Sequence, residues 1–135
     1  MSDYTTVKRP IWLAPDGRKV RIIDQRQLPH AFVIADLADT GDVIRAIREM
    51  MVRGAPLIGA TGAYGVYLAV FEAQGDRDRF EALCDRIASA RPTAVNLVWA
   101  VDRVRAAVRN AGAPEGWVEA ARTAADGICE AEADS

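Results

Sequence analysis

The stretch MMVRGAPLIGATGAYGVYLAV, residues 50–70, places one arginine, four glycines and one proline between two apolar runs. We expect Arg53-Gly54 to end one helix and Pro56 to open the next, because proline fixes a helical φ and lacks only an N–H that has no partner in a first turn. The second helix is expected to run to about Ala73. The stretch therefore predicts two helices joined by a break that carries Arg53.

Three glycines, Gly59, Gly62 and Gly65, fall inside the second of these helices. A glycine in a helix interior costs up to about 1 kcal/mol relative to alanine. Three of them on one helix indicate that a neighbouring element approaches its backbone closely. The glycine content also favours a packed helix of a soluble protein over a membrane span.

The residues before this stretch have strand character. Two β-rich runs, 11–13 and 20–24, flank a segment with Pro15 and Asp16-Gly17, which predicts a β-hairpin because proline fixes φ and glycine supplies a positive φ. A third short strand is expected over about Ala31 to Leu37.

Helical periodicity begins after the third strand. Thr40 is a suitable N-cap for the first helix, and Asp78 has the capping-box spacing for a third. Thr93 can cap a fourth helix, which runs to about Arg109, and a fifth is expected from Glu115.

The predicted fold class is therefore α+β. Residues 1–38 form a small antiparallel sheet of about three strands, and residues 39–135 form a bundle of about five helices. At 135 residues, the chain has the size of one domain.

Composition narrows the class of protein. A net charge of −2, with acidic and basic residues interspersed, argues against a nucleic-acid partner. The single histidine, His30, and two distant cysteines, Cys84 and Cys129, make a metal site improbable. The start of the sequence lacks the apolar core of a signal peptide, so we expect a reduced, cytoplasmic protein without a membrane segment.

Two helix breaks could carry a binding site. Arg53 in RGAP and Arg91 in RPT each stand just before a predicted helix N-terminus. The free N–H groups and positive dipole of such a terminus attract anions, and a guanidinium adds a bidentate donor suited to phosphate. Ordinary helix punctuation remains an alternative explanation for both breaks. If the two helices pack together, both arginines could converge on one phosphate.

Other polar positions are weaker candidates. Asp24 ends an apolar strand and could act in catalysis, although such an aspartate more often makes a turn hydrogen bond. His30 is expected in a loop, and Cys84 on an apolar helix face is expected to be an inert thiol. Asn96 and Trp99 could line a pocket or simply pack.

The C-terminal sequence Glu130-Ala131-Glu132-Ala133-Asp134 places acidic residues in a last helical turn, where they oppose the helix dipole. This pattern fits a solvated tail, and it also fits a chain that stops partway through a longer protein. Physical reasoning leaves both explanations open.

Four segments in order resemble one family. They are IIDQRQLP (22–29), MVRGAPLIG (51–59), AYG (63–65) and RPTAVNLVWA (91–100). Together they closely resemble the N-terminal part of the methylthioribose-1-phosphate isomerase family, whose relatives include regulatory subunits of translation initiation factor 2B and ribose-1,5-bisphosphate isomerase. The resemblance covers most of residues 11–109, and the motif set favours the isomerase branch.

This resemblance implies conversion of 5-methylthioribose 1-phosphate to 5-methylthioribulose 1-phosphate in methionine salvage, without an organic cofactor. It implies that Arg53, Gly54, Ala55 and Arg91 bind substrate. It also implies a homodimer and a fold in which a sheet and helices precede a Rossmann-like catalytic domain.

The chain departs from the family in length. The family's catalytic cysteine and aspartate lie in the C-terminal domain, and neither Cys84 nor Cys129 matches that cysteine segment. We therefore expect no catalytic residue in these 135 residues and no turnover by them alone. The alternatives are a regulatory or oligomerisation module like the translation-factor subunits, and a ribose-1,5-bisphosphate isomerase.

Overall fold

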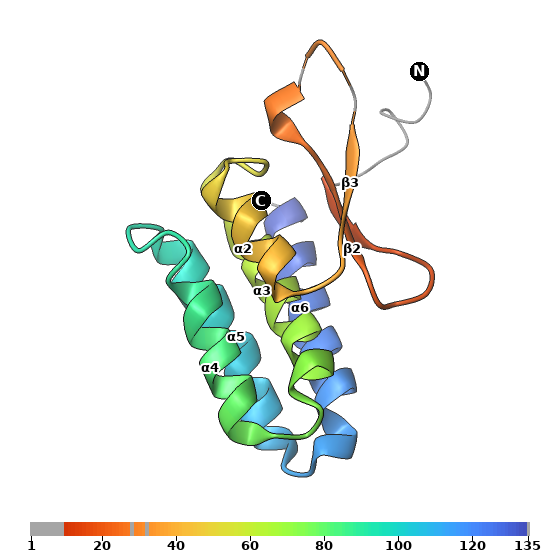
Figure 1. Cartoon of the computed structure of the whole chain (residues 1–135), viewed down its shortest axis with the longest axis vertical. Helices are drawn as coiled ribbons and strands as arrows, with labels where there is room; N and C mark the ends of the chain where they lie inside the picture. The colour runs from red at the N-terminus through yellow and green to blue at the C-terminus, as the bar shows by residue number, and fades with distance from the viewer. Residues whose placement is uncertain (1–9, 28, 32, 135) are drawn as a thin grey trace.

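A computed structural model describes residues 10–27, 29–31 and 33–134, and over these residues a three-stranded sheet packs beside five α-helices (Figure 1). The predicted α+β class is confirmed. The elements in chain order are β1 (Ile11–Leu13), β2 (Val20–Ile23), the 3₁₀ turn η1 (Gln25–Gln27), β3 (Ile34–Leu37), α2 (Thr40–Arg48), α3 (Ala55–Ala73), α4 (Arg77–Ala88), α5 (Val95–Ala111), the 3₁₀ turn η2 (Pro114–Gly116) and α6 (Trp117–Asp134).

The sheet has the order β1-β2-β3, and both strand pairs are antiparallel. The predicted hairpin is confirmed: its loop is closed by the Ala14 N–H, which donates to the Lys19 carbonyl at 2.9 Å, and Gly17 adopts a φ of 69°. The third strand begins at Ile34, later than the expected Ala31, and Phe32 lies outside the described residues.

Helix α2 begins with a different cap from the one predicted. The Asp39 carboxylate accepts a hydrogen bond from the Asp42 N–H at 2.8 Å, so Asp39 is the N-cap and Thr40 is the first helical residue. The N–H of Thr40 donates instead to the Glu72 carboxylate at 2.6 Å. The prediction for Thr40 was wrong because neighbouring Asp and Thr are both good caps, and only the chain path decides between them.

Helix α2 also ends earlier than the sequence indicated. Its last residue is Arg48, and the chain reverses through Met50, which has a φ of 60°. The Met51 N–H donates to the Ala46 carbonyl at 2.9 Å and the Met50 N–H to the Ile47 carbonyl at 3.3 Å, which is a Schellman motif. A methionine therefore occupies the left-handed position that usually holds glycine.

Gly54 acts at the start of the next helix rather than at the end of the preceding one. It is the N-cap of α3, with a φ of 88°, and its carbonyl accepts the first helical hydrogen bond from the Ile58 N–H at 3.0 Å. Pro56 lies in the first turn of α3, as predicted, and the helix ends at Ala73, also as predicted.

Helix α3 is the centre of the bundle, and all its residues from Leu57 to Val70 are buried. An added Cβ would lie 2.4 Å from Leu97 Cδ1 at Gly62, and 2.9 Å from Val43 Cγ1 at Gly65. The predicted close approach is confirmed, since α5 contacts one of these glycines and α2 the other. No helix within the described residues is long and apolar enough to span a membrane.

The starts of the last three helices correct three boundary predictions. Asp76, not Asp78, caps α4 by accepting the Arg79 N–H at 3.1 Å. Helix α5 begins after Ala94 without a side-chain cap, so Thr93 does not cap it. Glu115 lies in the 3₁₀ turn η2 that precedes α6.

The sheet lies on one side of the bundle, against α2 and α3 (Figure 1). The Tyr67 hydroxyl on α3 donates to the Gly17 carbonyl in the β-hairpin turn, and the Arg18 guanidinium stacks 4.2 Å from the centre of the Phe71 ring. These contacts fix the hairpin to the central helix. Residues 24–27, which follow β2, consequently lie near the end of α2.

Candidate functional site

Helices α3 and α5 begin at the same end of the bundle (Figure 1). The two helices are in contact near their starts, because a Cβ added to Gly59, the fifth residue of α3, would lie 3.3 Å from the carbonyl oxygen of Asn96, the second residue of α5. The two helices therefore pack together, which a shared site for both arginines requires. The breaks that carry Arg53 and Arg91 lead into neighbouring helix N-termini.

The turn with Arg53 has a buried base and an exposed tip. Met51 and Val52 are buried, whereas Arg53, Gly54 and Ala55 are exposed to solvent. This arrangement anchors the turn in the core and leaves the guanidinium and the first backbone groups of α3 accessible to a ligand.

The break with Arg91 has a similar form. Ala90 is buried, Arg91 is half-buried, and Pro92 is exposed. The Arg91 carbonyl accepts the Ala94 N–H at 2.9 Å, which closes a turn directly before α5. The arginine is thus held at the entry of the helix rather than on its side.

The two helix starts beside these arginines share a further property. Neither Gly54 at α3 nor Ala94 at α5 provides a side-chain cap, whereas Asp39 and Asp76 cap α2 and α4 with carboxylates. A capping carboxylate occupies the position that an anionic ligand would take. The helices that follow the two arginines leave that position open.

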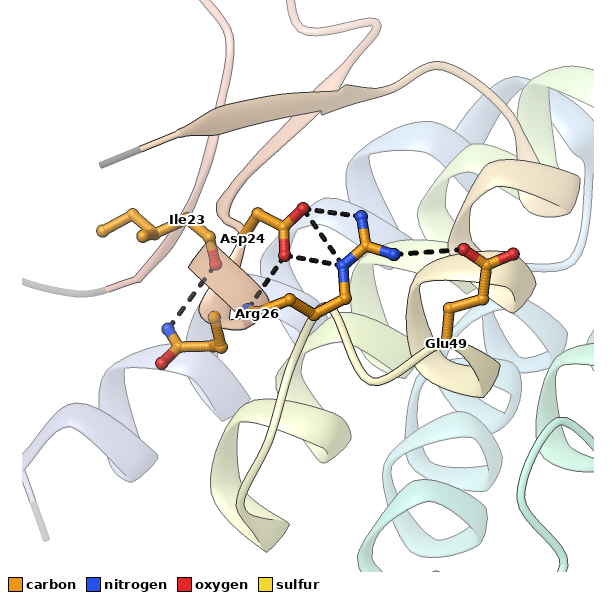
Figure 2. A network of polar contacts seen from close by, with 5 residues as sticks. Ile23, Asp24, Arg26 and Glu49 are labelled. Atoms are coloured by element: carbon orange, nitrogen blue, oxygen red, sulfur yellow. Dashed lines mark hydrogen bonds and ion pairs between the residues drawn. The ribbon is translucent and has the colours of Figure 1, made fainter. Parts of the chain in front are cut away.

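A polar network of Asp24, Arg26 and Glu49 links the end of β2 to the residue that follows α2 (Figure 2). The Asp24 carboxylate is 5% exposed and accepts hydrogen bonds from the Arg26 backbone N–H at 3.0 Å and from Nη2 at 2.8 Å. Arg26 Nη1 reaches the Glu49 carboxylate at 3.3 Å, just after the last residue of α2.

The sequence indicated either a turn hydrogen bond or catalysis for Asp24, and the turn hydrogen bond is present. The hydrogen bonds from Arg26 hold the pKa of Asp24 below its ordinary value, although burial opposes this shift. Sequence reasoning missed Arg26 and Glu49. Their partnership spans 23 residues, so no local pattern reveals it.

The other candidate residues lie elsewhere. His30 is exposed, and Cys84 is fully buried, where burial raises the pKa of its thiol to about 12. Asn96 is half-buried at the first turn of α5. In the part of the chain that the structure describes, no group of three His, Cys, Asp or Glu side chains could hold a metal ion.

Trp99 is half exposed and borders a groove of about 470 Å³ between α5 and α6. The groove is lined by Trp99, Arg103, Ala107, Thr123, Ala124, Gly127 and Ile128. Neither Arg53 nor Arg91 contributes to it, so this groove is separate from the helix-terminus site.

The fold and the site together define the class: an α+β protein in which a small sheet packs on a helical bundle, and two helices of the bundle begin beside an arginine without a side-chain cap. No protein-family model matches the chain, but individual proteins do. It is 56% identical over 131 residues to methylthioribose-1-phosphate isomerase of Desulfosudis oleivorans, a match that covers 94% of this chain and 35% of that protein. Over nearly its whole length the chain is similar to curated methylthioribose-1-phosphate isomerases, and it spans about a third of the length of those it matches.

Solved structures show the same similarity. The delta subunit of translation initiation factor eIF-2B from A. fulgidus superimposes with a TM-score of 0.84 at 30% identity, over 91% of this chain and 37% of that one. The 5-methylthioribose 1-phosphate isomerase from Pyrococcus horikoshii also gives 0.84, at 28% identity over 93% of this chain and 37% of that one. The predicted family resemblance is confirmed.

Proposed function

We propose that this chain is the N-terminal substrate-binding part of an isomerase that converts 5-methylthioribose 1-phosphate to 5-methylthioribulose 1-phosphate in methionine salvage. Arg53, Gly54, Ala55 and Arg91 bind the sugar phosphate. The identity of 56% to an isomerase of that name supports the substrate, and the two uncapped helix starts support the site.

The observation that carries the proposal is the pairing of α3 and α5 at one end of the bundle (Figure 1). The N–H groups in a helix's first turn have no partner within that helix, and the helix dipole favours negative charge at this end. A guanidinium beside each terminus adds donors in the planar geometry that a phosphate accepts. Together these groups provide a phosphate site without a metal ion.

Binding by these groups does not itself isomerise a sugar. Moving hydrogen between C1 and C2 requires a group that transfers it and an environment that polarises the carbonyl. The four proposed residues supply contacts to the phosphate and no such group. We propose that a Rossmann-like C-terminal domain supplies the catalytic groups, that the enzyme is a cytoplasmic homodimer, and that this chain alone has no isomerase activity.

The test is direct binding. The purified chain would be titrated with 5-methylthioribose 1-phosphate and followed by NMR. We expect shifts at the amides of Gly54 and Ala55, and binding weakened by about tenfold or more in Arg53→Ala and Arg91→Ala, because each loses hydrogen bonds between charged groups. Arg79→Ala is the matched control: this exposed arginine lies at the start of α4, at the opposite end of the bundle.

An absence of saturable binding by the unmodified chain would refute the proposal. Equal loss of affinity in Arg79→Ala would also refute the assigned site, because it would show a response to net charge rather than to position.

A second function is supported by the equal structural similarity to the eIF-2B delta subunit. Under this alternative the chain is a regulatory or oligomerisation module that acts through protein contacts. It predicts that Arg53→Ala and Arg91→Ala leave the affinity for the sugar phosphate unchanged.

A ribose-1,5-bisphosphate isomerase is a further alternative. Titration with ribose 1,5-bisphosphate in the same assay tests it, because the sugar phosphate that binds more tightly identifies which of the two isomerases the chain comes from.

A further inference from the structure

The end of strand β2 is tied to the turn that carries Arg53 by more than one contact. The Gln25 N–H donates to the Met51 carbonyl at 2.8 Å, two residues before Arg53. The Arg26 guanidinium reaches Glu49, which precedes Met50 in the same turn. Residues 25 and 26 therefore hold the first half of the turn, on both sides of Met50.

Two residues of the turn adopt a positive φ. Met50 has a φ of 60°, a conformation that costs about 1 kcal/mol or more for a residue with a side chain. Gly54, at the end of the turn, has a φ of 88°. A turn with two left-handed positions keeps one shape only where its surroundings determine that shape.

The Asp24 carboxylate orients the Arg26 guanidinium, which contacts the turn through Glu49. Nε and Nη2 of Arg26 both donate to Asp24, at 3.0 and 2.8 Å, and this leaves Nη1 to face Glu49 (Figure 2). The paired geometry fixes the plane of the guanidinium. Asp24 is also held in place, because its own N–H donates to the Val33 carbonyl at 2.8 Å.

We propose that Asp24 and Arg26 are positioning residues that, through Glu49, hold the 49–54 turn in the shape that presents Arg53 and the start of α3 to the sugar phosphate. This inference rests on the proposed function. It assigns Asp24 a role through other residues rather than contact with substrate, because both of its carboxylate oxygens already accept hydrogen bonds from Arg26.

The test compares Asp24→Asn with a matched control, Asp36→Asn. Asp36 also pairs with an arginine, since Arg21 Nε lies 3.1 Å from its carboxylate, but this pair is exposed on the sheet. Both variants remove one negative charge. In Asp24→Asn, one amide group turns a donor toward the Arg26 guanidinium and breaks its paired geometry.

The first measurement is hydrogen exchange at the Gln25 amide, which reports the link between the strand end and the turn. We expect faster exchange in Asp24→Asn and no change in Asp36→Asn. The second is NMR titration with 5-methylthioribose 1-phosphate, for which we expect affinity about 2- to 30-fold lower in Asp24→Asn only. Arg26→Gln tests the same link from a half-exposed position if Asp24→Asn does not fold.

The outcomes separate the two ideas. If the unmodified chain binds the sugar phosphate and Asp24→Asn binds it equally well, the positioning role is wrong and the proposed function stands. Unchanged exchange at Gln25 also rejects the positioning role, whatever the ligand does. If the unmodified chain does not bind, the proposed function fails, and the positioning role fails with it.

Discussion

Substituting Gly65 by alanine tests the close packing of the central helix. In a helix interior this change gains about 1 kcal/mol from intrinsic propensity. The new Cβ, however, would lie 2.9 Å from Val43 Cγ1 and 3.2 Å from Ile87 Cδ1, whereas carbon atoms pack best at about 3.5–4.0 Å. Both neighbours are fully buried, and valine in a helix has one strongly preferred rotamer.

The net effect follows from these two contributions. Overpacking a core costs about 1–3 kcal/mol, so Gly65→Ala should lower the free energy of unfolding by up to about 2 kcal/mol. Gly127 on α6 is the matched control, because it is exposed and nothing lies within 4 Å of its added Cβ. Gly127→Ala should raise the free energy of unfolding by about 0.5–1 kcal/mol.

Urea denaturation followed by circular dichroism measures both variants, and the difference between them isolates the overpacking cost of about 1–3 kcal/mol. In a Val43→Ala background the 2.9 Å contact is removed and the 3.2 Å contact with Ile87 Cδ1 remains, so Gly65→Ala should be less destabilising there than in the unmodified chain. If Gly65→Ala stabilises the unmodified chain as much as Gly127→Ala does, the packing argument is refuted.

Three further outcomes are expected. Asp39→Ala should lower the free energy of unfolding by about 0.5–2 kcal/mol, because α2 loses its cap. Ala94→Ser should raise the free energy of unfolding, because it adds a cap at the uncapped start of α5. Urea titration measures both variants, and a lower stability in both would contradict the assigned caps. The pKa of Asp24 is lowered in the folded state, so its ionised carboxylate stabilises the fold above the ordinary aspartate pKa of about 4. The loss of unfolding free energy in Asp24→Asn should therefore be full at pH 7 and shrink as the pH falls through about 4 and below. Urea titrations at each pH measure this loss, and a loss that does not change with pH would contradict the lowered pKa. Cys84 and Cys129 are buried, so neither thiol should react with a disulfide reagent at pH 8 until denaturant is added, and a fast-reacting native thiol would contradict their burial.

Local patterns in the sequence were sufficient for most elements of the fold. The hairpin follows from Pro15 and Gly17, whose backbone preferences act within a few residues. The helices follow from apolar spacing, and the glycines of α3 correctly indicated a close neighbour. The caps were less predictable, since Asp39 and Thr40 are adjacent and both can cap a helix. After α2 the chain reverses through a methionine in a left-handed conformation that sequence rules assign to glycine.

Exposure on α5 is harder to predict from spacing. Val98 lies next to the buried Leu97 on this apolar helix, but it is 37% exposed and lies beside the half-exposed Trp99. Periodicity identifies an apolar face, but its width depends on which neighbouring helices cover it.

The α+β class, the two arginine-bearing breaks and the family resemblance follow from the sequence alone, because periodicity, turn residues and short motifs can be recognised without knowing how the chain packs. The folded structure was needed to show that the breaks of α3 and α5 lie at one end of the bundle, that both helices start without a side-chain cap, and that Arg26 reaches Glu49. These facts depend on how distant segments pack, and packing is set by the sum of contacts around the central helix rather than by any local pattern.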